Sequence, residues 1–430
     1  MPTRSEATSG GSTTAPPDPV LDALRKSCGE GRARRAESGD AVAGVFPRFV
    51  ASPASSLETA DLLAAAAQHD LTVVARGAGT KLGWGLPPTR VDLVVETTGL
   101  SGVVEHVAGD LVCVVGAGTP VTELQQQLAS SGQQLALDSP LPGATLGGTV
   151  AVSTSGPRRL LYGTMRDLLI GVTFVRADGV LAKAGGKVVK NVAGYDFGKL
   201  LTGSYGALGL VTEVVVRLHP RPAARRVVTV GLDDHREAAR VARAVLGSQL
   251  VPSAIEVDQS GDGPVTVTVL LEGIEQGVGA RAQAALGLLG GHAVVSGDPP
   301  AGFTDLPFTA DGTGLKVTTT ISGLEEVLRS ARDLSAELGP AVVLRGSAMG
   351  VLHAGLPAST APDTVATVVD RLRTTAARYG GSLTVLTAPA DVRAAVDMWG
   401  PVPGLALMRR VKDEMDPGHR LAPGRFLGWI

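Results

Sequence analysis

From Ser56 onward, short apolar runs alternate with stretches of helical spacing. The segment 57–70 reads LETADLLAAAAQHD and follows Ser55 and Ser56, either of which is a candidate N-cap, so we predict a helix there. A second helix is predicted over 119–132. Short buried strands are predicted over 71–75, 91–96, 102–107 and 111–116. This part of the chain is therefore expected to be an α+β region of short elements.

The alternation of predicted strands and helices stops over residues 138–166 and resumes from residue 168. The stretch 138–166 has few bulky side chains and many glycines and hydroxyls, which is typical of backbone that wraps around a ligand. The segment 168–186 predicts a hairpin with its turn at Asp178 and Gly179. The segment 195–220 predicts a helix, a glycine turn and a long strand.

Beyond Pro220 a regular alternation of strands and helices begins. Strands are predicted over 227–232, 254–258, 265–273, 315–321, 341–346 and 350–356, and helices over 234–247, 275–289, 322–338 and 363–379. Each half of this region resembles a β-α-β-β-α-β unit. A last helix is predicted in LALMRRVKDEM, from residue 405.

These changes of pattern predict four parts of the chain. Residues 1–44 are expected to be a disordered tail and a short helix, because the first twenty residues are polar and rich in Ser, Thr, Gly and Pro. A first domain is expected over 45–220 and a second over 221–404. The segment 405–430 is expected to return to the first domain.

Composition narrows the class of protein. Glycine makes up 56 of 430 residues, well above the usual share of about 7%. The net charge of −2 gives no basic surplus for a nucleic-acid partner, and 44% hydrophobic residues exclude a disordered chain. The two cysteines stand far apart, which makes a disulfide framework or zinc site unexpected and fits a reducing cytoplasm. No apolar stretch is long enough to span a bilayer, so we expect membrane contact only peripherally, through partners.

Two glycine-rich segments are candidates for binding an anion. RGAGTKLGWG (76–85) follows a predicted strand, and its glycines would let backbone N–H groups approach a phosphate; the alternative is a plain tight turn. It matches neither the Rossmann fingerprint nor the P-loop. In PLPGATLGGTVAVSTSG (140–156), a helix start at Thr145 could present the N–H groups of Gly147 and Gly148 to a diphosphate. A hydroxyl-rich loop without a ligand explains the second segment equally well.

The order of the motifs is more specific than any one of them. RGAGT (76–80) is followed by PLPGATLGG (140–148), LYGTMR (161–166), the hairpin, GYDFGKLLTGSYGALGLVTE (194–213) and DPGHRLAPGRF (416–426). As a set they resemble the PCMH-type FAD-binding domain of the vanillyl-alcohol-oxidase-like family, over about 45–220 and 405–428. Within that family, GGKVVKNVAGYD (185–196) and the second half of the chain look most like the FAD-binding subunit of bacterial glycolate oxidase.

The resemblance implies two α+β subdomains that hold FAD and a separate cap of antiparallel sheet and helices. It implies non-covalent binding, because the covalent members carry a histidine in the first glycine turn and this turn, around Thr80, has none. The residues that it assigns to FAD are Arg76, Gly77, Ala78, Gly79, Thr80, Lys81, Pro142, Thr145, Gly147, Gly148, Ser153, Ser155, Gly156, Val211 and Arg425.

One departure from the resemblance limits the functional prediction. Relatives that oxidise 2-hydroxy acids carry a paired-histidine segment that binds a divalent metal, whereas the corresponding RGSAMGVLHAGLP (345–357) keeps only His353. No metal site is therefore expected, and no catalytic residue is assigned. A lone histidine in an apolar strand is more often a core residue than a ligand.

Three functions remain open at this point. The first is a flavin subunit that supports or relays electrons from a catalytic flavoprotein, together with an iron–sulfur subunit, in a complex acting on glycolate or another small 2-hydroxy acid. The second is a self-sufficient FAD-linked dehydrogenase in which Arg345 or Tyr195 holds the substrate. The third is a scaffold that has lost electron transfer. A basic patch, Lys183, Lys187, Lys190 and Lys199, is a candidate partner surface.

Overall fold

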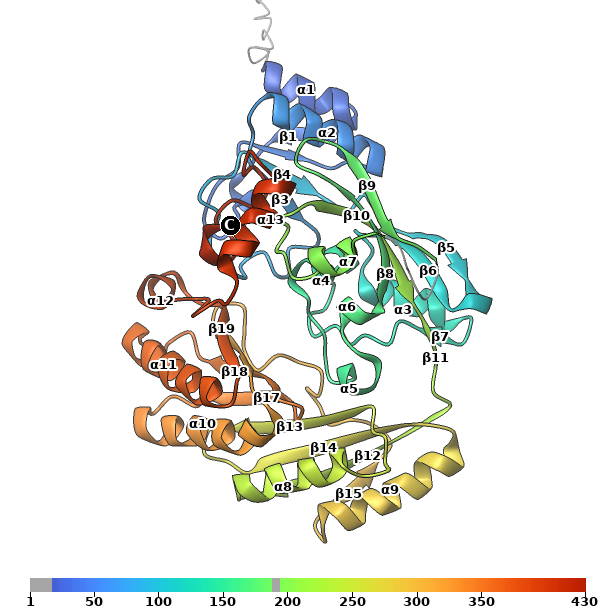
Figure 1. Ribbon diagram of the computed structural model, residues 1–430, viewed down its shortest axis with the longest axis vertical. Coiled ribbons are helices and arrows are strands. Elements are labelled where there is room, and N and C mark those ends of the chain that lie inside the picture. Colours follow the sequence, from blue (N-terminus) through green and yellow to red (C-terminus); the bar gives the residue numbers. More distant parts are fainter. Residues whose placement is uncertain (1–17, 188–193) are drawn as a thin grey trace, which may run out of the picture.

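The protein is described by a computed structural model that covers residues 18–187 and 194–430. Two parts stand one above the other in Figure 1, and the chain crosses from the upper to the lower part after β11 (His219–Pro220) and back after β19 (Ser382–Thr387). The predictions that concern residues 1–17 and Lys190 lie outside the described residues.

The upper part begins with two helices on a small mixed sheet. Its strands run in the order β1 (Ala33–Arg35), β2 (Phe49–Ala51), β4 (Leu93–Glu96), β3 (Val73–Arg76). The pairs β2–β4 and β3–β4 are parallel, and β1 pairs antiparallel with β2. Helices α1 (Pro19–Cys28) and α2 (Ser56–Gln68) bury their apolar residues against this sheet. Ser55 caps α2, since its hydroxyl accepts from the Glu58 N–H at 3.1 Å.

A second sheet in the upper part is antiparallel throughout. Its order is β5 (Val103–Val107), β6 (Val112–Gly116), β10 (Leu210–Arg217), β8 (Leu169–Val175), β9 (Leu181–Gly185). The β8–β9 turn lies at Asp178 and Gly179, as the sequence predicts. The remaining elements here are α3 (Val121–Ala129), β7 (Gln133–Gln134), α4 (Leu146–Val152), α5 (Arg159–Tyr162), α6 (Met165–Leu168) and α7 (Phe197–Leu201). Helices α3, α4 and α6 share an apolar core with this sheet.

The lower part is one antiparallel sheet of eight strands. Its order is β15 (Val294–Ser296), β12 (Ala224–Leu232), β14 (Val265–Gly273), β13 (Ala254–Ser260), β17 (Val343–Ser347), β18 (Val351–Leu356), β16 (Thr313–Thr318), β19 (Ser382–Thr387). Two β-α-β-β-α-β units meet where β13 pairs with β17, and each unit has its strands in the same order counted outward from that pair. The predicted pair of units is therefore present.

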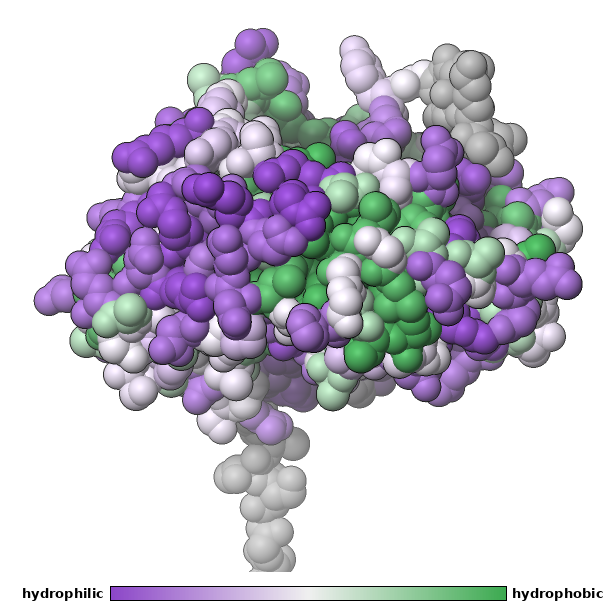
Figure 2. Space-filling model, turned by 90° about the horizontal axis from the view of Figure 1, so that it is seen from below, coloured by the Kyte–Doolittle hydropathy of each residue, from purple (hydrophilic) through white to green (hydrophobic). Residues whose placement is uncertain are grey.

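Helices cover only one face of this sheet. They are α8 (His235–Leu246), α9 (Glu275–Leu289), α10 (Leu324–Leu338) and α11 (Pro362–Arg378), and they form a single large core with the strands. Figure 1 shows α8 and α9 below the sheet, α10 and α11 beside it on the left, and the upper part of the molecule above it. Seen from below, this surface is largely hydrophilic with one apolar area (Figure 2); exposed apolar residues of the lower part include Ile274, Val294 and Val295.

The chain ends against the upper part. After α12 (Ala390–Ala395), helix α13 (Leu405–Met415) leads into a segment that bonds to β3: the Val73 N–H donates to the Arg420 carbonyl and the Ala422 N–H donates to the Val73 carbonyl, each at 2.8 Å. Short 3-10 turns complete the chain at Ser38–Asp40, Ala108–Asp110, Ile321–Gly323 and Leu427–Trp429.

This architecture confirms the predicted fold class, α+β with an antiparallel-sheet cap, and we call residues 221–404 the cap. The exact boundaries 45–220, 221–404 and 405–430 stay predictions. Within the described ranges, no helix combines the length and apolar character needed to cross a membrane.

Candidate functional site

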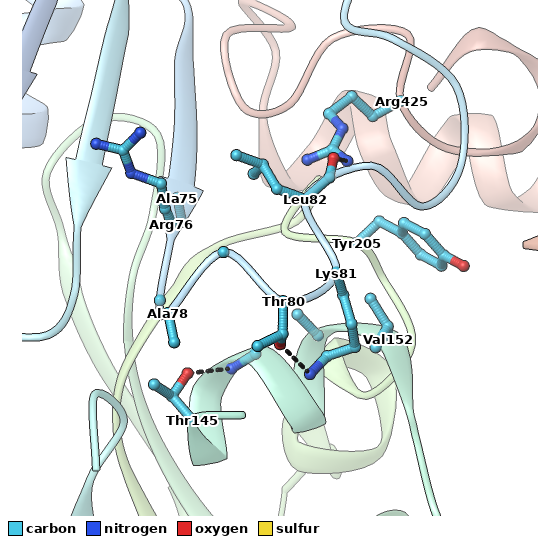
Figure 3. Close-up of a pocket in the computed structure, with 14 residues that line it drawn as sticks. Ala75, Arg76, Ala78, Thr80, Lys81, Leu82, Thr145, Val152, Tyr205 and Arg425 are labelled. Carbon is cyan, nitrogen blue, oxygen red and sulfur yellow. Dashed lines mark hydrogen bonds between the residues drawn. The ribbon is translucent and has the colours of Figure 1, made fainter. Parts of the chain in front are cut away.

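A cavity lies between the turn after β3 and the start of α4 (Figure 3). Its lining includes nine of the residues assigned from the sequence: Arg76, Gly77, Ala78, Gly79, Thr80, Lys81, Thr145, Gly148 and Arg425. We call it the first cavity. Segments far apart in the chain thus meet here, as the order of the motifs predicted.

The turn offers a run of backbone donors to the first cavity. Across the described residues, no acceptor is found for the N–H groups of Gly77 through Lys81. Two glycines make this course possible. Gly79 has a φ of +76°, and a Cβ on Gly77 would lie 2.3 Å from the Thr145 hydroxyl oxygen. Consecutive unbonded N–H groups are a typical phosphate-binding arrangement.

Lys81 adds a cation that has no counter-ion. The side chain is only 8% exposed, and its ammonium bonds to the Thr80 hydroxyl at 3.2 Å, with no carboxylate partner among the described residues. Burial lowers the pKa of Lys81 to about 8. Figure 3 shows the ammonium at the base of the turn, above α4. A buried lysine in this state favours an anionic ligand.

The two assigned arginines that line this cavity form hydrogen bonds within the protein. The Arg76 guanidinium points away from the cavity and donates to Asp40 Oδ1 and Glu96 Oε1, both at 2.7 Å. Arg425 donates from Nη2 to the Leu82 carbonyl at 2.6 Å and to the Trp84 carbonyl at 2.9 Å. Within 18–187 and 194–430 the Nε of Arg425 has no hydrogen-bond partner, and burial lowers the pKa of its guanidinium to about 10.

The start of α4 differs from the expectation. Thr145 is the N-cap as predicted, but the Gly147 N–H donates to the Ala117 carbonyl at 2.7 Å and the Gly148 N–H to the Thr145 hydroxyl at 3.2 Å. Neither group is free to bind a diphosphate. The reason is close packing, since a Cβ on Gly147 would lie 2.9 Å from the Ala117 Cβ. The free donors lie in the turn instead.

A second cavity adjoins the first and lies against the cap. Val152 and Tyr205 line both cavities. Aromatic rings form one wall: Trp84, Tyr205, Trp399 and Phe426. Tyr205, Trp399 and Phe426 contact one another with ring centroids 5.3–5.5 Å apart. Such a wall fits a flat conjugated ring. Ser153 and Ser155, two of the assigned residues, line this cavity as well.

A third cavity continues from the second along the cap sheet. Arg159 and His353 line both of them, and Lys316 lines the second. Ser155 and Gly156 line the third. His353 therefore faces a cavity and not the apolar core, contrary to the simpler expectation for a lone histidine. Burial, reinforced by Arg159 and Lys316, lowers its pKa to about 3.

Three assigned residues and one proposed substrate ligand lie elsewhere. Pro142 is exposed, and neither Gly147 nor Val211 lines any of these three cavities; Pro140 lines the second and third where Pro142 was expected. Tyr195 is 86% exposed. Pro142, Gly147 and Val211 as FAD ligands, and Tyr195 as a substrate ligand, stay predictions. Spacing alone could not tell which proline of the PLP segment turns inward.

Several cavity residues were missed from the sequence. Trp84, Arg159, Tyr205, Glu256, Lys316, Trp399 and Phe426 line the second or third cavity. The available signal was polar residues within apolar strands, as at Lys316 in LKVTT and Glu256 in AIEVD. The second interpretation named Arg345, which does line the third cavity, but its Nε bonds to Asp258 Oδ2 at 2.5 Å.

The basic patch is partly neutralised. Lys187 pairs with Glu105, and Lys199 pairs with Asp196 at 2.7 Å. Lys183 is exposed. As a surface for a partner it remains a prediction.

The donor set fits FAD and does not fit a metal. The unbonded N–H groups of residues 77–81 and the unpaired Lys81 match the charge of a diphosphate, and the aromatic wall matches a flavin ring. In the described ranges, no group of three or more His, Cys, Asp or Glu side chains is placed to hold a metal ion. His353 has cations as neighbours, which would repel one.

Comparison with known proteins agrees with this geometry. Residues 47–185 match a family described as FAD binding domain, so this part of the chain is an FAD-binding domain. The chain is 31% identical over 212 residues to glycolate oxidase subunit GlcD of Bacillus subtilis, covering 49% of this chain and 45% of that protein. It is 39% identical over 154 residues to glycolate oxidase subunit GlcE of Escherichia coli, covering 35% and 43%. The D-lactate dehydrogenase of Archaeoglobus fulgidus is 32% identical over 210 residues, covering 48% and 46%. These matches span about half or less of each protein.

Solved structures show the fold over nearly the whole chain. An alkyldihydroxyacetonephosphate synthase has a TM-score of 0.74 at 15% identity and covers 97% of this chain and 87% of its own. FgChi7B has a TM-score of 0.69 at 16% identity, covering 93% and 97%. At such identities the likeness shows a shared fold alone.

Proposed function

We propose that this chain is the FAD-binding subunit of a multi-subunit oxidase or dehydrogenase of glycolate or a similar 2-hydroxy acid. It binds FAD non-covalently and supports or relays electron transfer from a catalytic flavoprotein subunit. The observation that carries the proposal is the first cavity, where five unbonded N–H groups and the unpaired Lys81 face one space beside the aromatic second cavity.

In this proposal the turn of residues 77–81 and Lys81 bind the diphosphate of FAD. The flavin ring extends past Val152 and Tyr205, which line both cavities, toward the aromatic wall. FAD supplies the electron-transfer chemistry when it is bound, and the chain supplies binding, orientation and exclusion of water. Arg425 contributes by fixing the carbonyls of Leu82 and Trp84, which holds the turn in shape.

The proposed partners are a catalytic flavoprotein and an iron–sulfur subunit. Similarity to two different glycolate oxidase subunits, GlcD and GlcE, supports a complex of several chains. The lack of a metal-binding group near His353 in the described residues supports placing the main oxidation in the partner. We propose a cytoplasmic location, with membrane contact only peripherally and through the complex.

A second candidate is a self-sufficient dehydrogenase. The observation in its favour is that Arg159, Lys316 and His353 line the second cavity together with its aromatic residues. Reduction of the bound flavin by a hydroxy acid in the isolated chain would favour this candidate over the subunit role.

The test is co-purification of this chain with its proposed partners, combined with flavin spectroscopy. The tagged chain is co-expressed with the catalytic and iron–sulfur subunits of a glycolate oxidase, and flavin absorbance and anaerobic reduction by glycolate are recorded for the complex and for the chain alone. We expect the three chains to co-purify and the flavin of this chain to be reduced only in the complex.

A matched pair of glycine variants separates the remaining interpretations. In Gly148→Leu the new side chain enters the first cavity, where a Cβ would already lie 3.9 Å from Lys81 Nζ, so FAD is lost. Gly287→Leu is the control, because Gly287 in α9 has no atom within 4 Å of an added Cβ. A Gly148→Leu complex without FAD in this chain but with full activity would show that the chain is only a scaffold.

A further inference from the structure

A row of polar side chains crosses the open face of the cap sheet. The register of the antiparallel pairs places them directly opposite one another on five neighbouring strands: Thr384, Lys316, His353, Arg345 and Asp258. Directly opposed residues lie on the same face of a sheet. This is the face turned toward the upper part of the molecule, whereas the other face is covered by α8–α11 (Figure 1).

At one end of the row, Arg345 and Asp258 find their hydrogen-bond partners within the protein. Arg345 donates from Nε to Asp258 Oδ2 at 2.5 Å and from Nη1 to the Gly302 carbonyl at 2.8 Å. Its charge is therefore balanced by Asp258. The adjacent pair of Arg158 and Asp138, 2.7 Å apart, is balanced in the same way.

Two cations beside this end have no counter-ion. The Lys316 ammonium makes no ion pair or hydrogen bond within the part of the chain that the structure describes. Arg159, which begins α5 on the opposite wall, donates to the backbone carbonyls of Gly156 and Ser155 and pairs with no carboxylate there. Burial lowers the pKa of both groups, and for Lys316 the nearby Arg159 lowers it further.

The neighbouring titratable groups do not offset these charges. Glu256 is 6% exposed and lines the third cavity, and its Oε1 has no hydrogen-bond partner among the residues that the structure describes. Burial raises the pKa of Glu256 well above its usual value, which favours the uncharged carboxyl. His353 is uncharged as well. Asp305, at the third cavity, is exposed to solvent, where its charge is screened.

Two half-buried cations on facing walls, with an unpartnered carboxyl group beside them, favour an anionic ligand. We propose that the second and third cavities bind a small dicarboxylate, with one carboxylate on Arg159 and the other on Lys316, and with Glu256 hydrogen-bonded to the ligand between them. Such a ligand would bridge the first part of the chain and the cap. The proposal deepens the proposed function, because the ligand would lie beside the expected flavin position.

The experiment is calorimetric titration of the full chain with malonate and tartronate, compared with acetate and glycolate, near neutral pH. We expect both dicarboxylates to bind at least about tenfold more tightly than the monocarboxylates, the fold-change typical of one charge-assisted hydrogen-bonded contact. Lys316→Met should lose this preference, because only one cation remains. Lys183→Met, at an exposed lysine, is the control and should bind as the unaltered chain does.

Two further measurements keep the result interpretable. The unfolding midpoint of Lys316→Met without ligand shows whether the variant is folded, and Glu256→Gln, which stays neutral, should retain dicarboxylate binding. Glycolate binding as tightly as malonate, absence of malonate binding, or unchanged malonate affinity in Lys316→Met would each overturn the proposal. Flavin absorbance is recorded on the same samples, so a chain that binds malonate without FAD contradicts the proposed function and leaves this site standing.

Discussion

At the scale of single residues, Gly77 is required by a close contact. A Cβ there would lie 2.3 Å from the hydroxyl oxygen of Thr145, the side chain that caps α4. Gly77→Ala should therefore lower the free energy of unfolding by about 1–3 kcal/mol, the usual cost of overpacking, and weaken FAD binding. Gly83→Ala, in the same turn but with no atom within 4 Å of its added Cβ, should change little.

A double-mutant cycle tests the cause of that loss. If the clash with Thr145 is responsible, Gly77→Ala should cost less in a Thr145→Ala background, as judged from denaturant unfolding of the four proteins. Equal losses in both backgrounds would show that the contact does not matter.

Lys81 predicts a pH dependence of FAD affinity. Its pKa in the free chain is about 8, below the usual value for lysine, and a bound diphosphate would raise it. The complex then holds a proton that the free chain loses, so the association constant should be constant below pH 8 and fall by up to about tenfold per pH unit above it. Fluorescence titration with FAD between pH 6 and about 9.5 measures this.

A matched pair of lysine variants tests whether Lys81 causes this pH dependence. Lys81→Met should bind FAD more weakly, by about tenfold or more, with no fall above pH 8. Lys26→Met, at an exposed lysine of α1, should keep both the affinity and the pH profile of the unaltered chain. The same alkaline fall in Lys81→Met would assign the titration to another group.

The residue scale also shows what a sequence reveals about such a site. The letters RGAGTK indicate a turn with exposed N–H groups, and nine of the fifteen assigned residues meet in one cavity. That Lys81 lacks a counter-ion, or that the N–H of Gly147 is taken by Ala117, depends on contacts between distant segments. No local pattern contains that information.

At the scale of elements, a buried ion pair fixes the end of α13. Lys412 is 0% exposed and donates to the carbonyls of Ala207 and Leu421, each at 2.8 Å, and to Asp416 Oδ2 at 2.7 Å. Asp416 accepts in turn from the N–H groups of Arg420 and Leu421. These bonds join the helix to the segment that lies against β3.

Breaking this pair from one side should be costly. Lys412→Met leaves Asp416 buried without its cation, which typically lowers the free energy of unfolding by about 3–5 kcal/mol. The added change Asp416→Asn removes the unpaired charge and should restore part of the stability. Denaturant unfolding measures both, and a loss below about 1 kcal/mol in Lys412→Met would contradict the structural role given to the pair.

Elements were predictable wherever local signals agreed. The caps and periodicity gave α2, α9 and the β8–β9 hairpin with little error. The small elements β15 and α12 were not located from sequence, because the first is three exposed residues at a sheet edge and the second is only six residues long. Both depend on tertiary packing more than on propensity.

At the scale of the whole molecule, aromatic and polar contacts join the cap to the rest. Trp399 of the cap packs against Tyr205 and Phe426. The Gly85 N–H donates to the Leu386 carbonyl at 2.9 Å, and Tyr162 approaches Glu272 at 3.5 Å. The sequence predicted two β-α-β-β-α-β units, but it could not show that their open face would turn toward the glycine-rich segments. That arrangement creates the second and third cavities and places the orphan cations there.

The separate cores predict two unfolding transitions. Leu124 and Leu328 are both fully buried, the first in the core of the second upper sheet and the second in the cap core, and these clusters share no buried residue. Leu124→Ala and Leu328→Ala should each cost about 2–5 kcal/mol. In calorimetry each should shift mainly one transition, and FAD at a hundred times its dissociation constant should add about 2.7 kcal/mol to the one that responds to Leu124→Ala. One transition shifted equally by both variants would show instead that the cap and the FAD-binding part unfold as a unit.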